Sequence, residues 1–310
     1  MKVSVRELLC PFFYLNTNHK FENTLLLAGS GRSGTTWLSS IINHRNAYRE
    51  MFEPFVSEYT RECRAFEYKQ YARPHDIRAD LLVGARKILS GRVKNRWVDQ
   101  FNRKFFCGRR IIKEIRANLL LRWLKNNFPQ MRVIFIIRHP CAVAHSRLKL
   151  GWPPALDRLL LQQELVEDFL SEHLDAINGA ASDFQRQIWL WSIENYVPLS
   201  QFRRGQLHVI FYENLCLDPA GEVAALFHWL GEKVGSGLAR VVSTPSAVSK
   251  NHSAIVNGKD LVGEWRRHVR PEEIESAMGI IARFGLDRLY DAASPVPRKD
   301  ALGNLFSTPK

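Results

Sequence analysis

The first strongly apolar run of the chain is followed by a glycine-rich stretch whose residue types are suited to phosphate. Leu25–Ala28 is typical of a buried strand, residues 29–36 read Gly-Ser-Gly-Arg-Ser-Gly-Thr-Thr, and residues 37–42 have the pattern of an amphipathic helix. In a strand, glycine turn and helix arranged in this way, backbone N–H groups converge on an anion. The stretch therefore predicts a phosphate site. Its predicted ligands are Gly31, Arg32, Ser33, Gly34, Thr35 and Thr36.

The loop departs from the nucleoside-triphosphate pattern G-x-x-x-x-G-K-[ST] at one position. Gly29 and Gly34 have the right spacing, but Thr35 stands where that pattern has lysine. Arg32, inside the loop, is the available cation. The loop is therefore expected to hold a phosphate without the lysine that reaches β- and γ-phosphates. The alternative is a tight strand-to-helix turn without a ligand.

A second candidate anion site lies near the middle of the chain. Arg132–Ile137 is β-branched and almost wholly apolar, which predicts an inner parallel strand, and Arg138 follows it directly. Pro140 opens the next helix, which carries Ser146. A guanidinium offers a planar fork to phosphate, and the hydroxyl adds a donor. The carboxyl ends of parallel strands share one edge, so both sites are expected there. The alternative is an arginine held in a surface ion pair.

Strands alternating with helices predict an α/β chain with a P-loop-like, three-layer fold, whose central parallel sheet is covered by helices on both faces. We expect a lead-in over residues 1–23, one domain over 24–291 and a poorly ordered tail over 292–310. Residues 54–110 are expected to cover one face of the sheet, and residues 151–182 to form an inserted excursion. The expected strands are residues 25–28, 111–113, 132–137 and 207–212, and the expected helices are residues 35–44, 118–127, 185–202, 219–230 and 271–284.

The amino-acid composition restricts the class of binding partner but does not identify one partner. The chain has 310 residues, with 44 Lys and Arg against 31 Asp and Glu, a formal net charge of +13 that favours an anionic partner. Five scattered cysteines, without a C-x-x-C pair, predict free thiols and no zinc site. We find no secretory signal and no apolar run of the roughly 20 residues that span a membrane. These features predict a cytoplasmic enzyme of bacterial type.

The two motifs together resemble those of sulfotransferases that use 3′-phosphoadenosine 5′-phosphosulfate (PAPS). Gly-x-Gly-Arg-Ser-Gly-Thr-Thr-Trp-Leu is similar to their 5′-phosphosulfate loop, and Arg138 with Ser146 matches the Arg and Ser of their 3′-phosphate motif. The resemblance runs from about Leu25 to Tyr290. It implies a sulfuryl donor, PAPS, no metal, a hydroxyl acceptor, and release of adenosine 3′,5′-bisphosphate (PAP). The arginine at position 32 is typical of carbohydrate- and tyrosine-sulfating members, which favours a sugar or glycolipid acceptor.

The resemblance also assigns residues to the adenine and to the 3′-phosphate. Trp37 matches the tryptophan that stacks on the base, and Tyr212 lies in a segment similar to the family's Tyr-Glu-Asp-Leu. Lys250 matches a basic residue that approaches the 3′-phosphate. For both aromatic residues, ordinary core packing is the alternative.

The resemblance implies that Arg32 and Lys113 stabilise the transferring group. The family's histidine base has no counterpart, since Ile115 occupies its position. Glu53 lies at about the distance at which tyrosine-sulfating members place a catalytic glutamate, and Glu50 and Glu114 are its rivals. In an apolar pocket such a carboxylate would have a raised pKa and accept the hydroxyl proton.

The sequence leaves three alternative functional classes open. A P-loop phosphotransferase or kinase is disfavoured by Thr35 and by the lack of an acidic residue closing an apolar strand for Mg²⁺. A nucleic-acid-binding protein is suggested by the charge, but the basic residues are spread along the chain. A PAPS-binding relative without catalysis is the third. The acceptor and the oligomeric state are not determined by the sequence.

Overall fold

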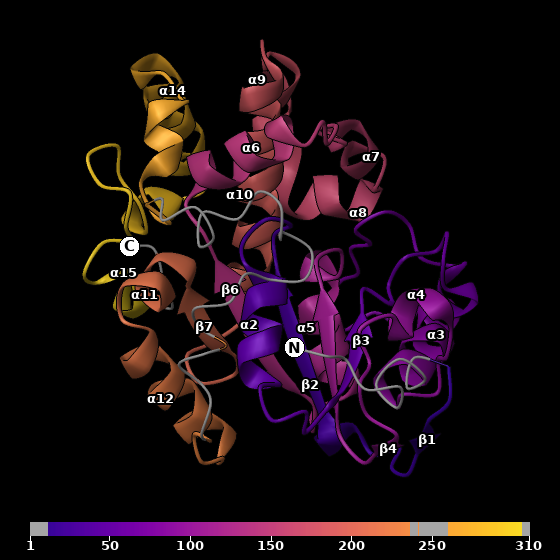
Figure 1. Cartoon of the computed structure of the whole chain (residues 1–310). Coiled ribbons are helices and arrows are strands. Elements are labelled where there is room, and N and C mark those ends of the chain that lie inside the picture. Colours follow the sequence, from indigo (N-terminus) through magenta and orange to yellow (C-terminus); the bar gives the residue numbers. More distant parts are fainter. Residues whose placement is uncertain (1–11, 236–240, 242–259, 306–310) are drawn as a thin grey trace.

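The computed structural model describes residues 12–235, 241 and 260–305, and its centre is a parallel sheet of five strands (Figure 1). The strand order is β3-β5-β2-β6-β7, and every neighbouring pair is parallel. This confirms the predicted α/β fold. The strands are β2 (Thr24–Gly29), β3 (Arg49–Phe52), β5 (Arg110–Glu114), β6 (Arg132–Ile137) and β7 (His208–Phe211), and a separate pair joins β1 (Leu15–Asn16) to β4 (Phe106–Cys107).

Helices cover both faces of this sheet, which explains the uninterrupted apolar runs of its strands. Along β2, Leu25 and Leu27 face one core while Leu26 and Ala28 face the other. Successive side chains of a strand point to opposite faces, so a strand between two helical layers must be apolar throughout. The α-helices are α2 (Thr35–Ile42), α3 (Ala79–Leu89), α4 (Arg96–Asp99), α5 (Leu121–Asn127), α6 (Pro140–Lys149), α7 (Leu156–Leu160), α8 (Gln163–Leu165), α9 (Leu174–Asn178), α10 (Asp183–Gln201), α11 (Tyr212–Leu217), α12 (Pro219–Leu230), α14 (Pro271–Ala282) and α15 (Ala301–Asn304).

The two cores differ in size. The smaller one contains side chains of α2, α11 and α12, and the larger one those of α3, α5, α6, α10 and α14. Short 3₁₀ turns and one π turn link these elements. They are η1 (Phe21–Asn23), η2 (Arg61–Cys63), η3 (Asn118–Leu120), the π turn η4 (Val166–Leu170), η5 (Ser171–His173), η6 (Glu264–Arg267) and η7 (Leu286–Arg288).

The strand order puts the glycine-rich loop at the switch point of the sheet. From β2, the chain first builds β3 and β5 on one side, then β6 and β7 on the other. Loops that leave the carboxyl ends of β2, β5 and β6 therefore meet at one edge, where open α/β sheets bind ligands.

Two features of the fold bear on the sequence-based expectations. The strand β3 was not predicted, because Arg49 and Glu50 interrupt its apolar pattern; Arg49 is nevertheless buried, and its Nε donates to Asp99 at 2.9 Å. A poorly ordered tail is expected from residue 292, and the structure describes this segment up to residue 305. That segment forms α15 and buries Ala301 and Leu305 against the larger core.

In the described part of the chain, no helix combines the length and apolar character needed to span a membrane. Cys63, Cys141 and Cys216 are free cysteines. Residues 151–182 form the short helices α7, α8 and α9, which Figure 1 shows grouped with α10 and α6.

Candidate active site

The loop between β2 and α2 has the conformation expected of a phosphate cradle. Arg32 and Gly34 both have left-handed backbones, with φ of 77° and 90°. A Cβ added to Gly34 would lie 2.5 Å from the ring of Tyr212, so only glycine fits. The helix α2 begins at Thr35, and the N–H groups of its first turn have no acceptor within the helix. The loop therefore directs free donors and a positive helix end to one place.

Two guanidinium groups meet at this loop. The Nε of Arg32 donates to Ser146 Oγ at 3.0 Å, and an Nη of Arg138 donates to the carbonyl of Arg32 at 3.0 Å. Among the described residues, neither group forms an ion pair with a carboxylate. Burial, followed by the charge of Arg138, lowers the pKa of Arg32. Partly buried positive charges without a counterion are the electrostatic requirement of an anion site.

Predicted adenine ligands lie next to this cluster. The rings of Trp37 and Tyr212 meet edge to face, with centroids 5.8 Å apart, and the guanidinium carbon of Arg138 lies 4.3 Å from the centroid of the Tyr212 ring. In the part of the chain that the structure describes, Ser33 Oγ and Trp37 Nε1 are buried without a hydrogen-bond partner. Buried polar atoms rarely lack partners, so this site fits a polar ligand such as a nucleotide. Lys250, the remaining predicted ligand, lies outside the described residues.

A charged cluster joins the neighbouring strands β3 and β5. The backbone N–H of Glu53 donates to the carbonyl of Lys113 at 2.8 Å, because Phe52 and Lys113 pair in register. The carboxylate of Glu53 forms an ion pair with Lys113 Nζ through one oxygen and with Arg116 at 2.5 Å through the other. Thus Glu53 and Lys113, which the sequence predicts as catalytic, are in contact.

The expectation that Glu53 lies in an apolar pocket with a raised pKa is wrong. Burial acts to raise the pKa of Glu53, but the charges of Lys113 and Arg116 outweigh it and lower that pKa. Glu53 is therefore ionised at neutral pH. A carboxylate in this state has no proton to donate and is able to accept one.

The two rival carboxylates have other contacts. Glu114 is completely buried and accepts the backbone N–H groups of Phe55, Ile115 and Arg116 at 2.8 to 2.9 Å. Glu50 accepts a hydrogen bond from Ser39 of α2 at 3.0 Å. Burial raises the pKa of both carboxyl groups. Of the three, Glu53 is the one that forms ion pairs with the cations of this cluster.

Sequence reasoning missed several residues that contact the site. These are Lys69, Arg116, Arg147, Glu194 and Asn195. Two of them carry a weak signal: Arg147 directly follows Ser146, and Glu194 is the only charged residue between positions 187 and 202 of a predicted helix. The other contacts depend on the fold, which brings distant segments together.

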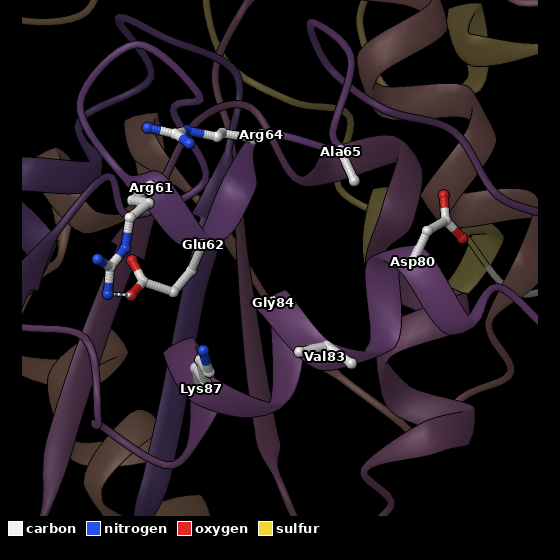
Figure 2. Close-up of a pocket in the computed structure, with 8 residues that line it drawn as sticks. All are labelled: Arg61, Glu62, Arg64, Ala65, Asp80, Val83, Gly84 and Lys87. Atoms are coloured by element: carbon white, nitrogen blue, oxygen red, sulfur yellow. Dashed lines mark ion pairs between the residues drawn. The ribbon is translucent and has the colours of Figure 1, made fainter.

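A pocket of about 330 Å³ lies elsewhere, between η2 and α3 (Figure 2). Arg61 and Glu62 form an ion pair of 3.7 Å on one side of it. All of its lining residues come from positions 61–65 and 80–87, so it contains none of the predicted site residues. In the described part of the chain, no group of three or more His, Cys, Asp or Glu residues is arranged to hold a metal ion.

A family model described as the sulfotransferase family matches residues 25–235. No curated protein matches the sequence significantly.

Similar solved structures include the sulfotransferase domain of the olefin synthase from Synechococcus PCC 7002, with 16% identity, coverage of 87% of this chain and 98% of that chain, and a TM-score of 0.48. The mouse sulfotransferase SULT7A1 in complex with PAP has 12% identity, coverage of 90% and 87%, and a TM-score of 0.46. Retinol dehydratase with androsterone and the inactive cofactor PAP has 15% identity, coverage of 89% and 83%, and a TM-score of 0.42.

The family match begins one residue into β2 and ends after α12. It therefore contains the glycine-rich loop, the Glu53–Lys113 pair and the Arg138–Ser146 pair. Since the match covers residues 25–235 of the 310, the protein belongs to the sulfotransferase family.

Proposed function

We propose that this chain transfers a sulfuryl group from PAPS to the hydroxyl of a carbohydrate or glycolipid acceptor. The observation that carries the proposal is the pair of guanidinium groups, Arg32 and Arg138, which have no carboxylate partner among the described residues and lie at the amino end of α2. When bound, PAPS supplies the activated sulfuryl group and departs as PAP.

Each residue in the cluster around the β2–α2 loop, here called the loop cluster, has a role in this proposal. The backbone amides of residues 34–36 bind the 5′-phosphate, and Arg32 stabilises negative charge on the bridging oxygen as the bond from sulfur breaks. Arg138 and Ser146, with Lys250, bind the 3′-phosphate. Trp37 and Tyr212 hold the adenine. The 3′-phosphate contact distinguishes this nucleotide from ATP, and Thr35 in place of lysine argues against a phosphotransferase.

The Glu53 cluster would complete the transfer. A bond forms between the acceptor oxygen and sulfur while the bond from sulfur to the bridging oxygen breaks, and the hydroxyl proton passes to Glu53. Lys113 already contacts the carboxylate of Glu53. As that carboxylate gains the proton, Lys113 becomes available to the oxygens of the transferring group. No step in this scheme requires a metal.

The acceptor class is supported by an exposed aromatic side chain. Trp152 is 37% exposed, and a Cβ added to Gly31 would lie 2.8 Å from its indole. An aromatic face on the phosphosulfate loop is suited to the apolar face of a sugar ring. The resemblance of the Arg32 loop to that of carbohydrate-sulfating enzymes favours the same class.

The substitution Glu53→Gln tests the assignment of the base. We expect turnover, followed with radiolabelled PAPS and a panel of sugars, to fall by about 10²- to 10⁴-fold. PAP affinity, measured by calorimetry, should stay nearly unchanged because Glu53 lies outside the loop cluster. Glu50→Gln is the matched control, since Glu50 contacts Ser39 of α2 instead of Lys113. Normal turnover in the Glu53 variant would contradict the assignment.

A further inference from the structure

The long helix α10 contacts two of the loops that form the candidate site. Trp191 Nε1 donates to the carbonyl of Arg138 at 3.0 Å, and Asn195 Nδ2 donates to Ser30 Oγ at 3.0 Å. Both residues are buried. Polar groups in the middle of a buried helix are costly to bury unless they have specific partners. Here the partners are the loop after β6 and the loop after β2.

Between these two residues lies a third polar side chain, Glu194, which is completely buried. One of its oxygens forms an ion pair with Lys69 Nζ, and the other forms an ion pair with Arg147 at 2.7 Å. Lys69 and Arg147 are also nearly inaccessible to solvent. One carboxylate thus forms ion pairs with two buried cations from different segments of the chain.

Each of these two cations also donates a hydrogen bond to a backbone carbonyl of the candidate site. The Nε of Arg147 donates to the carbonyl of Gly31 at 3.2 Å, one residue before Arg32. Lys69 Nζ donates to the carbonyl of Ile115 at 3.1 Å, between Lys113 and Arg116. Glu194 is therefore linked, through one cation on each side, to the phosphosulfate loop and to the loop that carries Lys113 and Arg116.

Unusual backbone conformations occur at some of the same residues, which is an observation separate from the ion pairs. Within the described residues, four positions other than glycine have positive φ: Arg32, Asn46, Glu53 and Lys69. Three of the four belong to the candidate site or to the Glu194 network. Left-handed backbones at residues with side chains are strained, and such strain persists where surrounding contacts impose it. Lys69, at φ 51°, is held in this way by its two partners.

We propose that Glu194 is a positioning residue that sets the separation between the phosphosulfate loop and the Lys113–Arg116 loop. In-line transfer requires the donor, held by the first loop, and the acceptor, activated beside the second, to be aligned closely. Buried ion pairs contribute little net stability compared with apolar replacements, so a geometric role accounts better for this one. The kinetic part of the inference depends on the proposed sulfuryl transfer.

Glu194→Gln keeps the shape of the side chain and removes its charge, which leaves Lys69 and Arg147 without a buried counterion. Asp157→Asn is the matched control, because it removes an ion pair to Arg186 whose carboxylate is 82% exposed. We expect kcat to fall by about 10²-fold in the Glu194 variant and to stay unchanged in the control.

Two further variants separate the branches of the network. Arg147→Met should weaken PAP binding by about 10-fold, because the carbonyl of Gly31 loses its donor. Lys69→Met should leave PAP binding unchanged and lower kcat, because its carbonyl contact lies on the acceptor side. A merely structural role would lower thermal stability in all three variants while leaving kcat per folded molecule and PAP affinity unchanged, and that result would overturn the inference.

Hydrogen exchange gives a readout that does not depend on turnover. Glu194→Gln should speed amide exchange at residues 30–34 and 114–116 by about 10-fold, with no change in β7. If the wild type binds no PAP but the exchange changes as expected, the proposed function fails and the positioning role stands. Unchanged exchange in both loops would overturn the positioning role whatever the activity.

Discussion

Arg32 and Glu53 have opposite electrostatic surroundings, and the difference assigns them different chemistry. Arg32 lies beside a second guanidinium, and neither group forms an ion pair with a carboxylate of the described residues. Glu53 lies between two cations, so its charge is already balanced before any ligand binds. The first arrangement favours binding of a nucleotide phosphate. The second keeps a carboxylate ionised at neutral pH until an acceptor proton reaches it.

Glu213, at the start of α11, gives a prediction at the same scale. Its carboxylate accepts the N–H of His139 at 2.8 Å and the hydroxyl of Tyr290 at 2.9 Å, beside Arg138. Burial raises the pKa of Glu213 from 4.5 to about 6, against the effect of its hydrogen bonds. The folded state therefore binds the proton more tightly than the unfolded state. This stabilisation is complete below pH 4.5 and is lost as pH rises through about 6.

The loss amounts to about 2 kcal/mol, as an order of magnitude. Gln at position 213 mimics the protonated form, since it keeps an acceptor for His139 and offers a donor to Tyr290. Urea unfolding at several pH values should show that Glu213→Gln depends less on pH than the wild type between pH 4.5 and about 7. Parallel pH curves for the two proteins would contradict the raised pKa.

At the scale of elements, the unit β2–loop–α2 depends on the absence of a side chain at Gly34. Gly231, after α12, is a suitable comparison, because it also has a left-handed backbone but has no atom within 4 Å of an added Cβ. Gly231→Ala should cost about 1–2 kcal/mol from backbone strain alone.

Gly34→Ala should cost more than Gly231→Ala, because the methyl group would also collide with the ring of Tyr212 at 2.5 Å. It should also abolish PAP binding, which Gly231→Ala leaves intact. Urea unfolding together with calorimetry checks both statements. Equal destabilisation of the two variants, with PAP binding retained in both, would show that Tyr212 yields and that the loop tolerates a side chain.

At the scale of the whole molecule, occupancy of the site should stabilise the fold, because its predicted ligands lie in the loop after β2, in α2, directly after β6, in α6 and in α11. At about a hundred times its Kd, PAP should contribute about 2.7 kcal/mol and raise Tm by several degrees. The shift should survive EDTA and exceed that of ADP, which lacks the 3′-phosphate. A shift that appears only with Mg²⁺ and ATP would favour a phosphotransferase instead.

The sequence by itself determined four of the five strands of the central sheet and the glycine-rich loop. Apolar runs such as 132–137 predict inner strands because both faces of the sheet are covered, and backbone binding of phosphate requires glycines at fixed local spacing. Both signals are contained in a few consecutive residues. For the same reason, two short motifs were enough to detect the resemblance to PAPS-dependent sulfotransferases.

Only the tertiary structure decided how the site is charged and held together. From its charge, Arg49 is expected on the surface, but it is buried against Asp99, which lies 50 residues later in the sequence. The pKa of Glu53 is lowered by Lys113 and Arg116, which lie 60 and 63 residues away in sequence. These effects depend on distances between side chains on different strands and on their removal from water. No local pattern encodes either quantity, because both arise when separate segments pack.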